Sequence, residues 1–157
     1  MCSSCLMGDE GLPTHWRLVI PRLPDDEGQT KARRELRRIG AVPIGDDVWA
    51  APEAPAFVAG MHRVSALVEA AGGTLVRLDT EPQDPRERMT AMTAFNAART
   101  AEWAAFRDEC RAFDGTQENL DRLRRHADEI QVHDIFSVPE AEVADRDLRA
   151  CIAALAG

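Results

Sequence analysis

A cluster of basic side chains is the feature of this sequence with the clearest chemical potential. Five of the eight positions from 31 to 38 are basic: Lys31, Arg33, Arg34, Arg37 and Arg38. A guanidinium group pairs bidentately with a phosphate or another tetrahedral oxyanion. The cluster therefore predicts a surface that binds DNA phosphates or an oxyanion. The alternative is the solvated outer face of an amphipathic helix.

The charge of the remaining residues confines such binding to this cluster. The 157-residue chain has a formal net charge of −8, and residues 31–38 carry +4, so the other residues together carry −12. A surface with that charge repels phosphate. We therefore expect any nucleic acid to contact the protein only locally.

Two further groups of residues have the types that bind metal ions. Cys2 and Cys5 have the C-x-x-C spacing of half a zinc site or of a redox pair, but no second pair follows them. His126, Glu129 and His133 recur at i, i+3 and i+7 of one predicted helix. We interpret the two cysteines as thiols in a flexible tail, and we expect no bound metal or cofactor.

Motifs for catalysis are not apparent. The sequence has no Ser-His-Asp order, no glycine-rich phosphate loop and no H-E-x-x-H motif. The neighbouring acids Asp46 and Asp47 are explained by a turn. We therefore expect that the protein is not an enzyme.

Composition indicates a soluble globular protein. Hydrophobic residues make up 45% of the chain and charged residues 29%, which is enough to build a core. No window approaches the roughly 18 apolar residues of a membrane span, and the N-terminus lacks a basic segment followed by a hydrophobic one. The expectation is a cytoplasmic protein with no membrane contact.

The first half of the sequence predicts alternating strands and helices. Pro21 within the first strand suggests an edge position or a strand end, Thr30 is expected to cap the first helix, and Gly40 to end it. The order within about 65 residues is the ferredoxin-like βαββαβ pattern, an antiparallel sheet with both helices on one face. The elements are a strand over 16–23, a helix over 30–39, a hairpin around 45–47, a helix between 55 and 72, and a strand over 74–80.

The second half predicts helices alone. Met89, Met92, Trp103, Phe106, Cys110 and Phe113 lie on one helical stripe, in which Arg99 is the odd member. Gly115 and Thr116 should end one helix and cap the next, forming an antiparallel helical hairpin, and a third helix starts near Pro139. The predicted organisation is a tail over 1–13, a ferredoxin-like domain over 14–82, and an all-helical extension over 83–157.

A series of short motifs resembles one known family. The segments "WRLVIPRLP", "ARRELRRIGAV", "VWAAP", "AAGG" and "HDIF" follow in order the pattern of the N-terminal domain of the chromate-resistance regulators called ChrB. The resemblance implies a transcription regulator that contacts promoter DNA or a chromate-like oxyanion through the basic helix, and that forms a homodimer. Longer members of the family append a second domain, which this chain is too short to hold.

Two alternative functions remain open. The first is a non-catalytic module that binds a protein or dimerises, with the helical hairpin as contact surface or the basic helix facing an acidic partner. The second follows from a resemblance of residues 46–49 to a hairpin of the ferredoxin-like CRISPR adaptation nucleases, which are metal-dependent phosphodiesterases. Those nucleases bind metal through an acid at the end of the first strand, where this sequence has Asp25 and Asp26 just beyond a proline.

Overall fold

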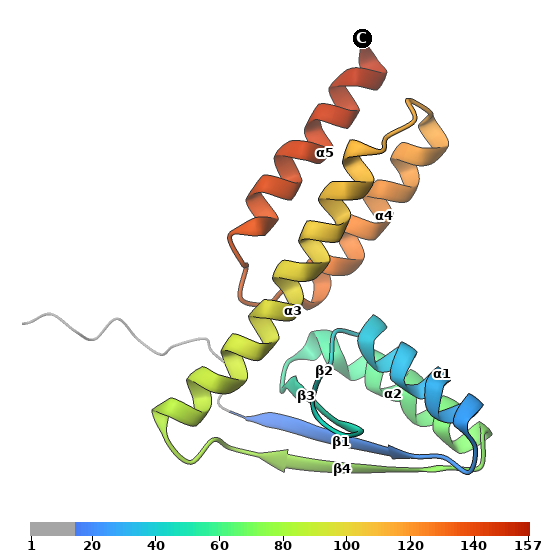
Figure 1. Ribbon diagram of the computed structural model, residues 1–157, viewed down its shortest axis with the longest axis vertical. Helices are drawn as coiled ribbons and strands as arrows, with labels where there is room; N and C mark the ends of the chain where they lie inside the picture. The colour runs from blue at the N-terminus through green and yellow to red at the C-terminus, as the bar shows by residue number, and fades with distance from the viewer. Residues whose placement is uncertain (1–14) are drawn as a thin grey trace, which may run out of the picture.

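The computed structural model describes residues 15–157, so the predicted tail with Cys2 and Cys5 lies outside the described residues. The chain is an α+β protein in which helices alternate with the strands of one sheet and three further helices follow (Figure 1). Its elements are β1 (Trp16–Arg22), α1 (Asp26–Arg38), β2 (Val42–Gly45), β3 (Val48–Pro52), α2 (Pro55–Ala70), β4 (Thr74–Thr80), α3 (Pro85–Arg111), α4 (Gln117–His133) and α5 (Glu140–Ala156).

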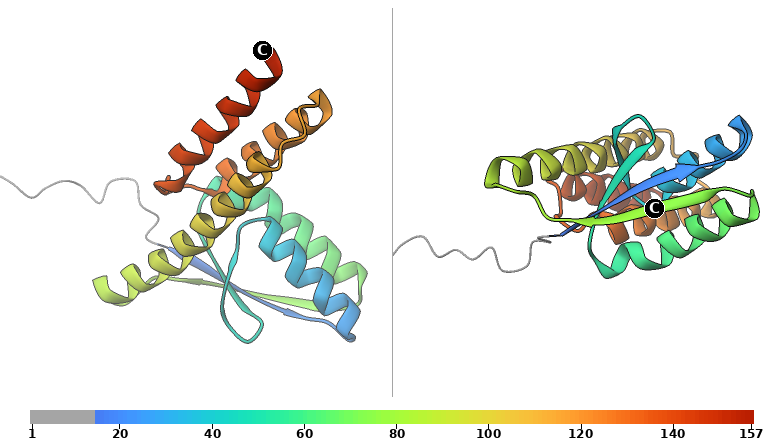
Figure 2. Two further views of the ribbon diagram at one scale, coloured as in Figure 1. Left: turned by 45° about the horizontal axis from the view of Figure 1, so that its top comes forward. Right: turned by 90° about the horizontal axis from the view of Figure 1, so that it is seen from below.

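The sheet has four strands in the order β2-β3-β1-β4, and every neighbouring pair is antiparallel. Helices α1 and α2 lie on one face of it, and β1 and β4 are seen in front of them from below (Figure 2, right). The predicted antiparallel sheet with interleaved helices is therefore confirmed. So is the prediction that no strand occurs after residue 86.

Pro21 lies next to the end of β1, which confirms the strand-end alternative of its prediction, although β1 is a central strand of the sheet. β3 pairs only with the first part of β1, from Trp16 to Val19. From Ile20 onward β1 has β4 alone as a neighbour, and there Pro21 faces Leu75. A central strand tolerates proline where the ladder on one side has already ended.

Helix α1 begins four residues before the predicted cap at Thr30. Asp25 is the N-cap, and its Oδ1 accepts a hydrogen bond from the Gly28 backbone N–H at 2.6 Å. The sequence of residues 25–29 did not predict a helix, because it contains Gly28 and glycine is a poor helix former. Gly28 is nevertheless buried, and a Cβ there would lie 3.0 Å from Leu23 Cδ2.

The core between the helices and the sheet follows the predicted stripes. Ala32 and Leu36 of α1 and Ile39 at its C-cap are buried, which confirms that this face anchors the basic helix. Burial of a leucine or isoleucine side chain contributes about 1.5–3 kcal/mol. The partners of these residues in the core include Val19, Trp49, Phe57, Met61, Val64 and Val68.

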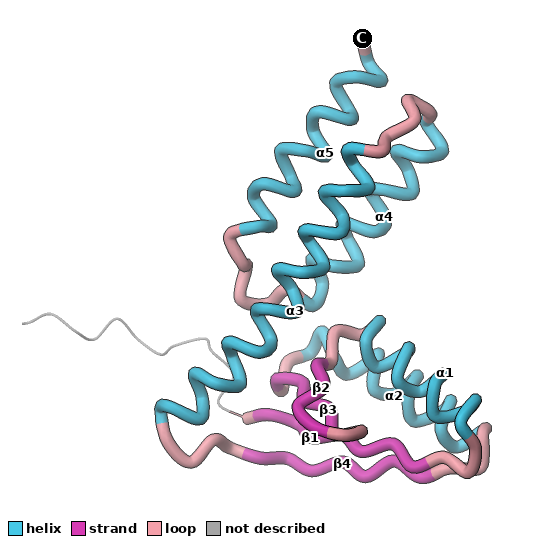
Figure 3. The backbone as a smooth tube through the Cα atoms, viewed as in Figure 1, coloured by secondary structure: helices cyan, strands magenta, loops and turns pink. Residues whose placement is uncertain are grey.

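Helix α3 belongs to two hydrophobic clusters. Near its middle, the Phe95 ring lies 6.0 Å from the Trp16 ring and 5.9 Å from the Phe57 ring, between centroids. Further along, Trp103 and Phe106 pack in a second cluster with α4 and α5, and the three helices run side by side (Figure 3). The sheet and the helical half are therefore joined by one continuous 27-residue helix.

The ends of the helices in this half match the prediction better than the stripe does. Gly115 has a φ of 79°, and the Thr116 hydroxyl accepts a hydrogen bond from the Asn119 N–H at 3.1 Å. Met89, expected on the buried stripe, is 60% exposed, because the first turns of α3 project past the sheet (Figure 1).

None of the helices described has the length and apolar composition that crossing a membrane requires.

Candidate functional site

The basic residues of α1 project from a helix whose opposite face is buried. Lys31, Arg34, Arg37 and Arg38 are exposed, and Arg33 is half-buried. The spacing that predicted this amphipathic helix also determines which side chains reach solvent. The surroundings of the five side chains differ, however, and these differences decide which of them could bind an external anion.

Two members of the cluster are paired within the chain. Lys31 Nζ lies 2.7 Å from Glu27 Oε1, one helical turn earlier, and this hydrogen bond raises the pKa of Lys31. Arg33 donates from Nε and Nη2 to the two carboxylate oxygens of Asp47, at 2.7 and 2.9 Å. This bidentate bond lowers the pKa of Asp47. It also ties α1 to the turn between β2 and β3.

The other three basic residues are less neutralised. The Arg37 guanidinium carbon lies 5.3 Å from the centre of the Trp49 ring, a cation–π contact, and no carboxylate of the described residues pairs with it. Arg38 Nη1 lies 3.5 Å from Glu35, whose carboxylate also pairs with Arg63 of α2 at 3.3 Å. No ion pair or hydrogen bond of the Arg34 side chain is found among residues 15–157. Arg34, Arg37 and Arg38 therefore carry the available positive charge.

A buried arginine supports the C-terminal end of this helix. Arg99 of α3 is only 1% exposed, and its Nη1 donates to the Gly40 carbonyl oxygen at 2.7 Å. Its Nε lies 3.0 Å from Glu102 Oε2, and its guanidinium carbon lies 4.6 Å from the centre of the Phe95 ring. Burial lowers the pKa of Arg99, and Glu102 opposes that effect. The basic helix is thereby linked to the helical half.

Helix α4 completes this junction. His133 is 7% exposed, and its Nε2 lies 3.1 Å from the same Glu102 oxygen that Arg99 contacts. Gly40 has a φ of 93°, and a Cβ there would lie 2.7 Å from His133 Cγ. Only glycine therefore fits between α1 and α4. The next residue, Asp134, accepts a hydrogen bond from Trp103 Nε1 at 2.9 Å.

The two histidines considered for metal binding each have a carboxylate partner. His126 Nδ1 lies 3.1 Å from Glu109 Oε1, whereas His133 is held by Glu102. Within the described part of the chain, no three His, Cys, Asp or Glu side chains form a group that could hold a metal ion. Asp25, considered for a nuclease site, caps α1. Cys110 and Cys151 are buried thiols between α3 and α5.

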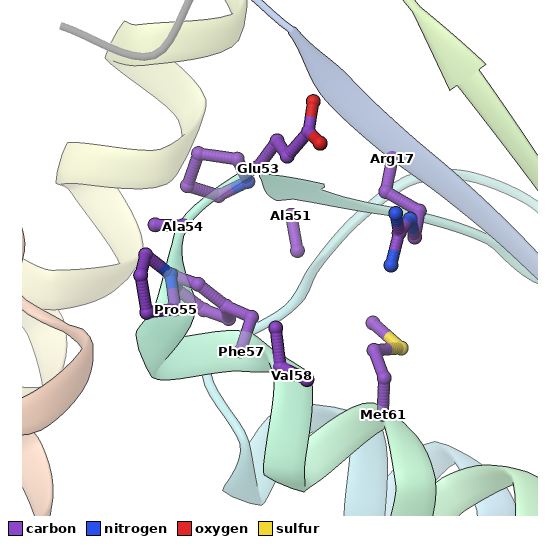
Figure 4. A pocket seen from close by; sticks show the side chains of 9 residues that line it. Arg17, Ala51, Glu53, Ala54, Pro55, Phe57, Val58 and Met61 are labelled. Carbon is purple, nitrogen blue, oxygen red and sulfur yellow. The ribbon is translucent and has the colours of Figure 1, made fainter.

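A pocket lies away from the basic cluster, between the end of β3 and the start of α2. Its volume is about 280 Å³, and most of its lining is apolar. Arg17 extends its guanidinium toward Val58 and Met61, whereas the Glu53 carboxylate is turned away (Figure 4). Asp79 already accepts a hydrogen bond from Arg17 Nε at 2.9 Å. The sequence did not indicate this pocket.

Fold and surface together define an α+β protein that presents one outward-facing basic helix on an otherwise acidic chain. A family profile described as "Protein ChrB, N-terminal" matches residues 30–118, more than half of the chain and the whole basic cluster. The chain belongs to this ChrB N-terminal domain family, which relates it to chromate resistance and confirms the resemblance noted from its motifs. No match was found among curated proteins.

The junction around Arg99 was missed at the level of the sequence. Arg99 occupies an apolar position of the α3 stripe, and a charged residue at such a position, followed three residues later by Glu102, was the available signal. Its partner Gly40 is 59 residues away in sequence. No local pattern indicates such a contact.

Proposed function

We propose that this protein is a non-catalytic regulator whose helix α1 contacts DNA or a chromate-like oxyanion, and that it acts as a homodimer. Arg34, Arg37 and Arg38 are the residues proposed to make the contact, with Lys31 and Arg33 at its border. The observation that carries the proposal is the outward projection of these arginines in a chain that is otherwise strongly acidic. Arginine forks pair well with phosphate and similar oxyanions.

The support of α1 favours a binding role. The helix is held by its buried face, by the bond between Arg33 and Asp47, and by the bond from Arg99 to Gly40. A rigid helix presents its arginines at fixed spacing, which lowers the entropic cost of binding. The contacts at Arg33 and Gly40 flank Arg34, Arg37 and Arg38, the residues proposed to bind.

The proposal extends to the topology of the first half of the chain. We propose that residues 14–82 form a ferredoxin-like domain. The strand order β2-β3-β1-β4, with α1 following β1 and α2 following β3, supports this assignment.

The nuclease alternative has weak support, because Asp25 is engaged as a helix cap and lies beyond the end of β1. A protein-binding module remains the second candidate. The unpaired charge of Arg34 favours it as much as it favours phosphate, since an acidic protein surface could approach the same face.

Fluorescence anisotropy with labelled DNA from the gene's own promoter region tests the main proposal. Affinity should fall steeply as salt concentration rises, because each phosphate contact releases bound cations. Arg34→Ala combined with Arg38→Ala should reduce the slope of log K against log salt by about two. The matched control is Arg124→Ala with Arg149→Ala, which removes two exposed arginines of α4 and α5 and should leave the slope unchanged.

Calorimetric titration with chromate provides the oxyanion arm of the test. Binding that the first pair of substitutions removes and the control pair retains would support an oxyanion site at α1. An unchanged salt slope in the first pair would place the DNA contact elsewhere. Absence of binding to both DNA and chromate would favour the protein-binding module.

A further inference from the structure

Strand β4 forms an open edge of the sheet. It is the last strand in the order β2-β3-β1-β4 and pairs only with β1, over all seven of its residues. No other strand within residues 15–157 pairs with its second side. Such an edge presents a row of N–H and C=O groups that another strand can pair with.

The side chains of β4 are unusual for an edge strand. Val76 and Leu78 are 41% and 50% exposed. Leu75 packs against the core between sheet and helices, so alternation places Val76 and Leu78 on the opposite face of the sheet. They continue the half-buried residues Ile20 and Leu18 of β1, which lie opposite them. Exposed apolar residues at an open edge indicate a contact surface.

Two charged residues alternate with these apolar ones. Arg77 and Asp79 lie on the helix-bearing face, because Arg77 is opposite the buried Val19. Both are exposed. Asp79 pairs with Arg17, and no ion pair of Arg77 is found in the described part of the chain. The edge therefore carries one charge of each sign, two residues apart.

We propose that β4 pairs antiparallel with β4 of a second copy of this chain, with Leu78 opposite Leu78. A two-fold axis perpendicular to the sheet keeps each face on its own side, so one residue must lie opposite its own copy. Centring on Leu78 places Arg77 opposite Asp79 of the second copy, and the symmetry repeats this pair. Opposite charges at directly opposed positions stabilise antiparallel strands.

The other registers lack this complementarity. Centring on Arg77 or on Asp79 sets like charges directly against each other. Centring on Thr80 sets Asp79 against Glu81. Centring on Val76 or an earlier residue leaves Arg77 and Asp79 without a charged partner. The charge pattern of β4 therefore selects one register, and it is the register that also brings the two exposed leucines together.

The paired sheet would have eight strands, with both copies of α1 on the same side. The β4 contact names the surface of the proposed homodimer and so rests on that part of the proposed function, but it does not depend on DNA or oxyanion binding. A standard interface buries about 800 Å² per partner. Two seven-residue strands cover less than this, so we expect an equilibrium between monomer and dimer that depends on protein concentration.

Sedimentation equilibrium of the full chain, without DNA or oxyanion, tests the contact. The unaltered chain should dimerise. Arg77→Asp and Asp79→Arg should each weaken the dimer by about tenfold, because each reversal places like charges opposite each other twice. An equimolar mixture of the two variants should dimerise again, since each introduced charge then meets its opposite.

Controls separate the interface from folding. Arg149→Asp reverses an exposed charge on α5 and should leave the dimer unchanged. Thermal melting should show that Arg77→Asp and Asp79→Arg remain folded, although the latter also removes the pair with Arg17.

A chain that is monomeric at all concentrations would overturn the contact. So would a dimer that neither reversal weakens, which would favour the helical hairpin instead, or a mixture of variants that fails to dimerise. A monomer that still binds DNA would overturn the β4 contact and leave the α1 proposal intact. A dimer that binds neither DNA nor chromate would leave the β4 contact intact and overturn the α1 proposal.

Discussion

Replacement of Arg99 by methionine removes the junction between the basic helix and the helical half. Methionine keeps much of the apolar volume beside Phe95 but loses the charge and every hydrogen bond. The Gly40 carbonyl oxygen, bound by Arg99 Nη1 at 2.7 Å, would then lack its buried partner. Glu102 would lose the cation that lies 3.0 Å from it.

The size of the effect follows from these two losses. Leaving a buried backbone carbonyl unpaired costs about 1–3 kcal/mol. Breaking a buried ion pair costs about 3–5 kcal/mol. The cost of losing the Arg99–Glu102 pair should be smaller, because the Glu102 side chain is 30% exposed and keeps His133 as a partner. The expected loss of unfolding free energy is about 3 kcal/mol. In a chain of this length it lowers Tm by about 6–12 °C.

Urea unfolding followed by tryptophan fluorescence measures this loss directly. The control is Arg149→Met, which removes an arginine whose side chain is 75% exposed and whose partner is Asp145. Such pairs contribute about 0–1 kcal/mol, so the control should be nearly neutral. If Arg99→Met destabilises the protein no more than Arg149→Met, the junction does not hold the two halves together.

Three further predictions concern single residues. Gly40→Ala should destabilise the protein more strongly than Gly115→Ala, because both have positive φ but only Gly40 would place its Cβ against His133; comparison of the two urea midpoints checks this, and equal losses would contradict it. Asp25→Ala should cost about 1 kcal/mol through loss of the α1 cap, measured by thermal melting, with Asp25→Ser largely restoring stability. Burial beside Cys151 raises the pKa of the Cys110 thiol from 9.0 to about 12, so the unfolded chain loses this proton first and stability should fall as pH rises from about 9 toward 12. A series of urea titrations over this pH range measures the fall in stability, and the chain has no tyrosine that would titrate in the same range. Cys110→Ala should make the fall shallower. An equally steep fall in the variant would assign the pH dependence of stability to other groups.

Local features of the fold were accessible from the sequence because their causes lie within a few residues. The hairpin at 45–47, the end of α1 at Gly40 and the cap at Thr116 follow from backbone preferences of turn and cap residues. The buried face of α2 follows from its helical spacing. The start of α1 was missed because Gly28 weakens the helical signal of the sequence. The close approach of Leu23, which favours glycine at position 28, is seen only in the structure.

For the candidate site too, some features follow from the sequence and others from the tertiary structure. The amphipathic spacing of α1 alone determines that its arginines face outward, since the helix must bury Leu36. Tertiary structure decides how much of that charge is available, because Asp47 neutralises Arg33 from 14 residues away and Arg63 shares Glu35 with Arg38. An ion pair depends on the distance between side chains in space, and chain distance determines it only within a helix or a turn. The sequence therefore determined where the positive charge lies, and only the packing of α1 against the sheet and α2 decided which arginines remain available to a partner.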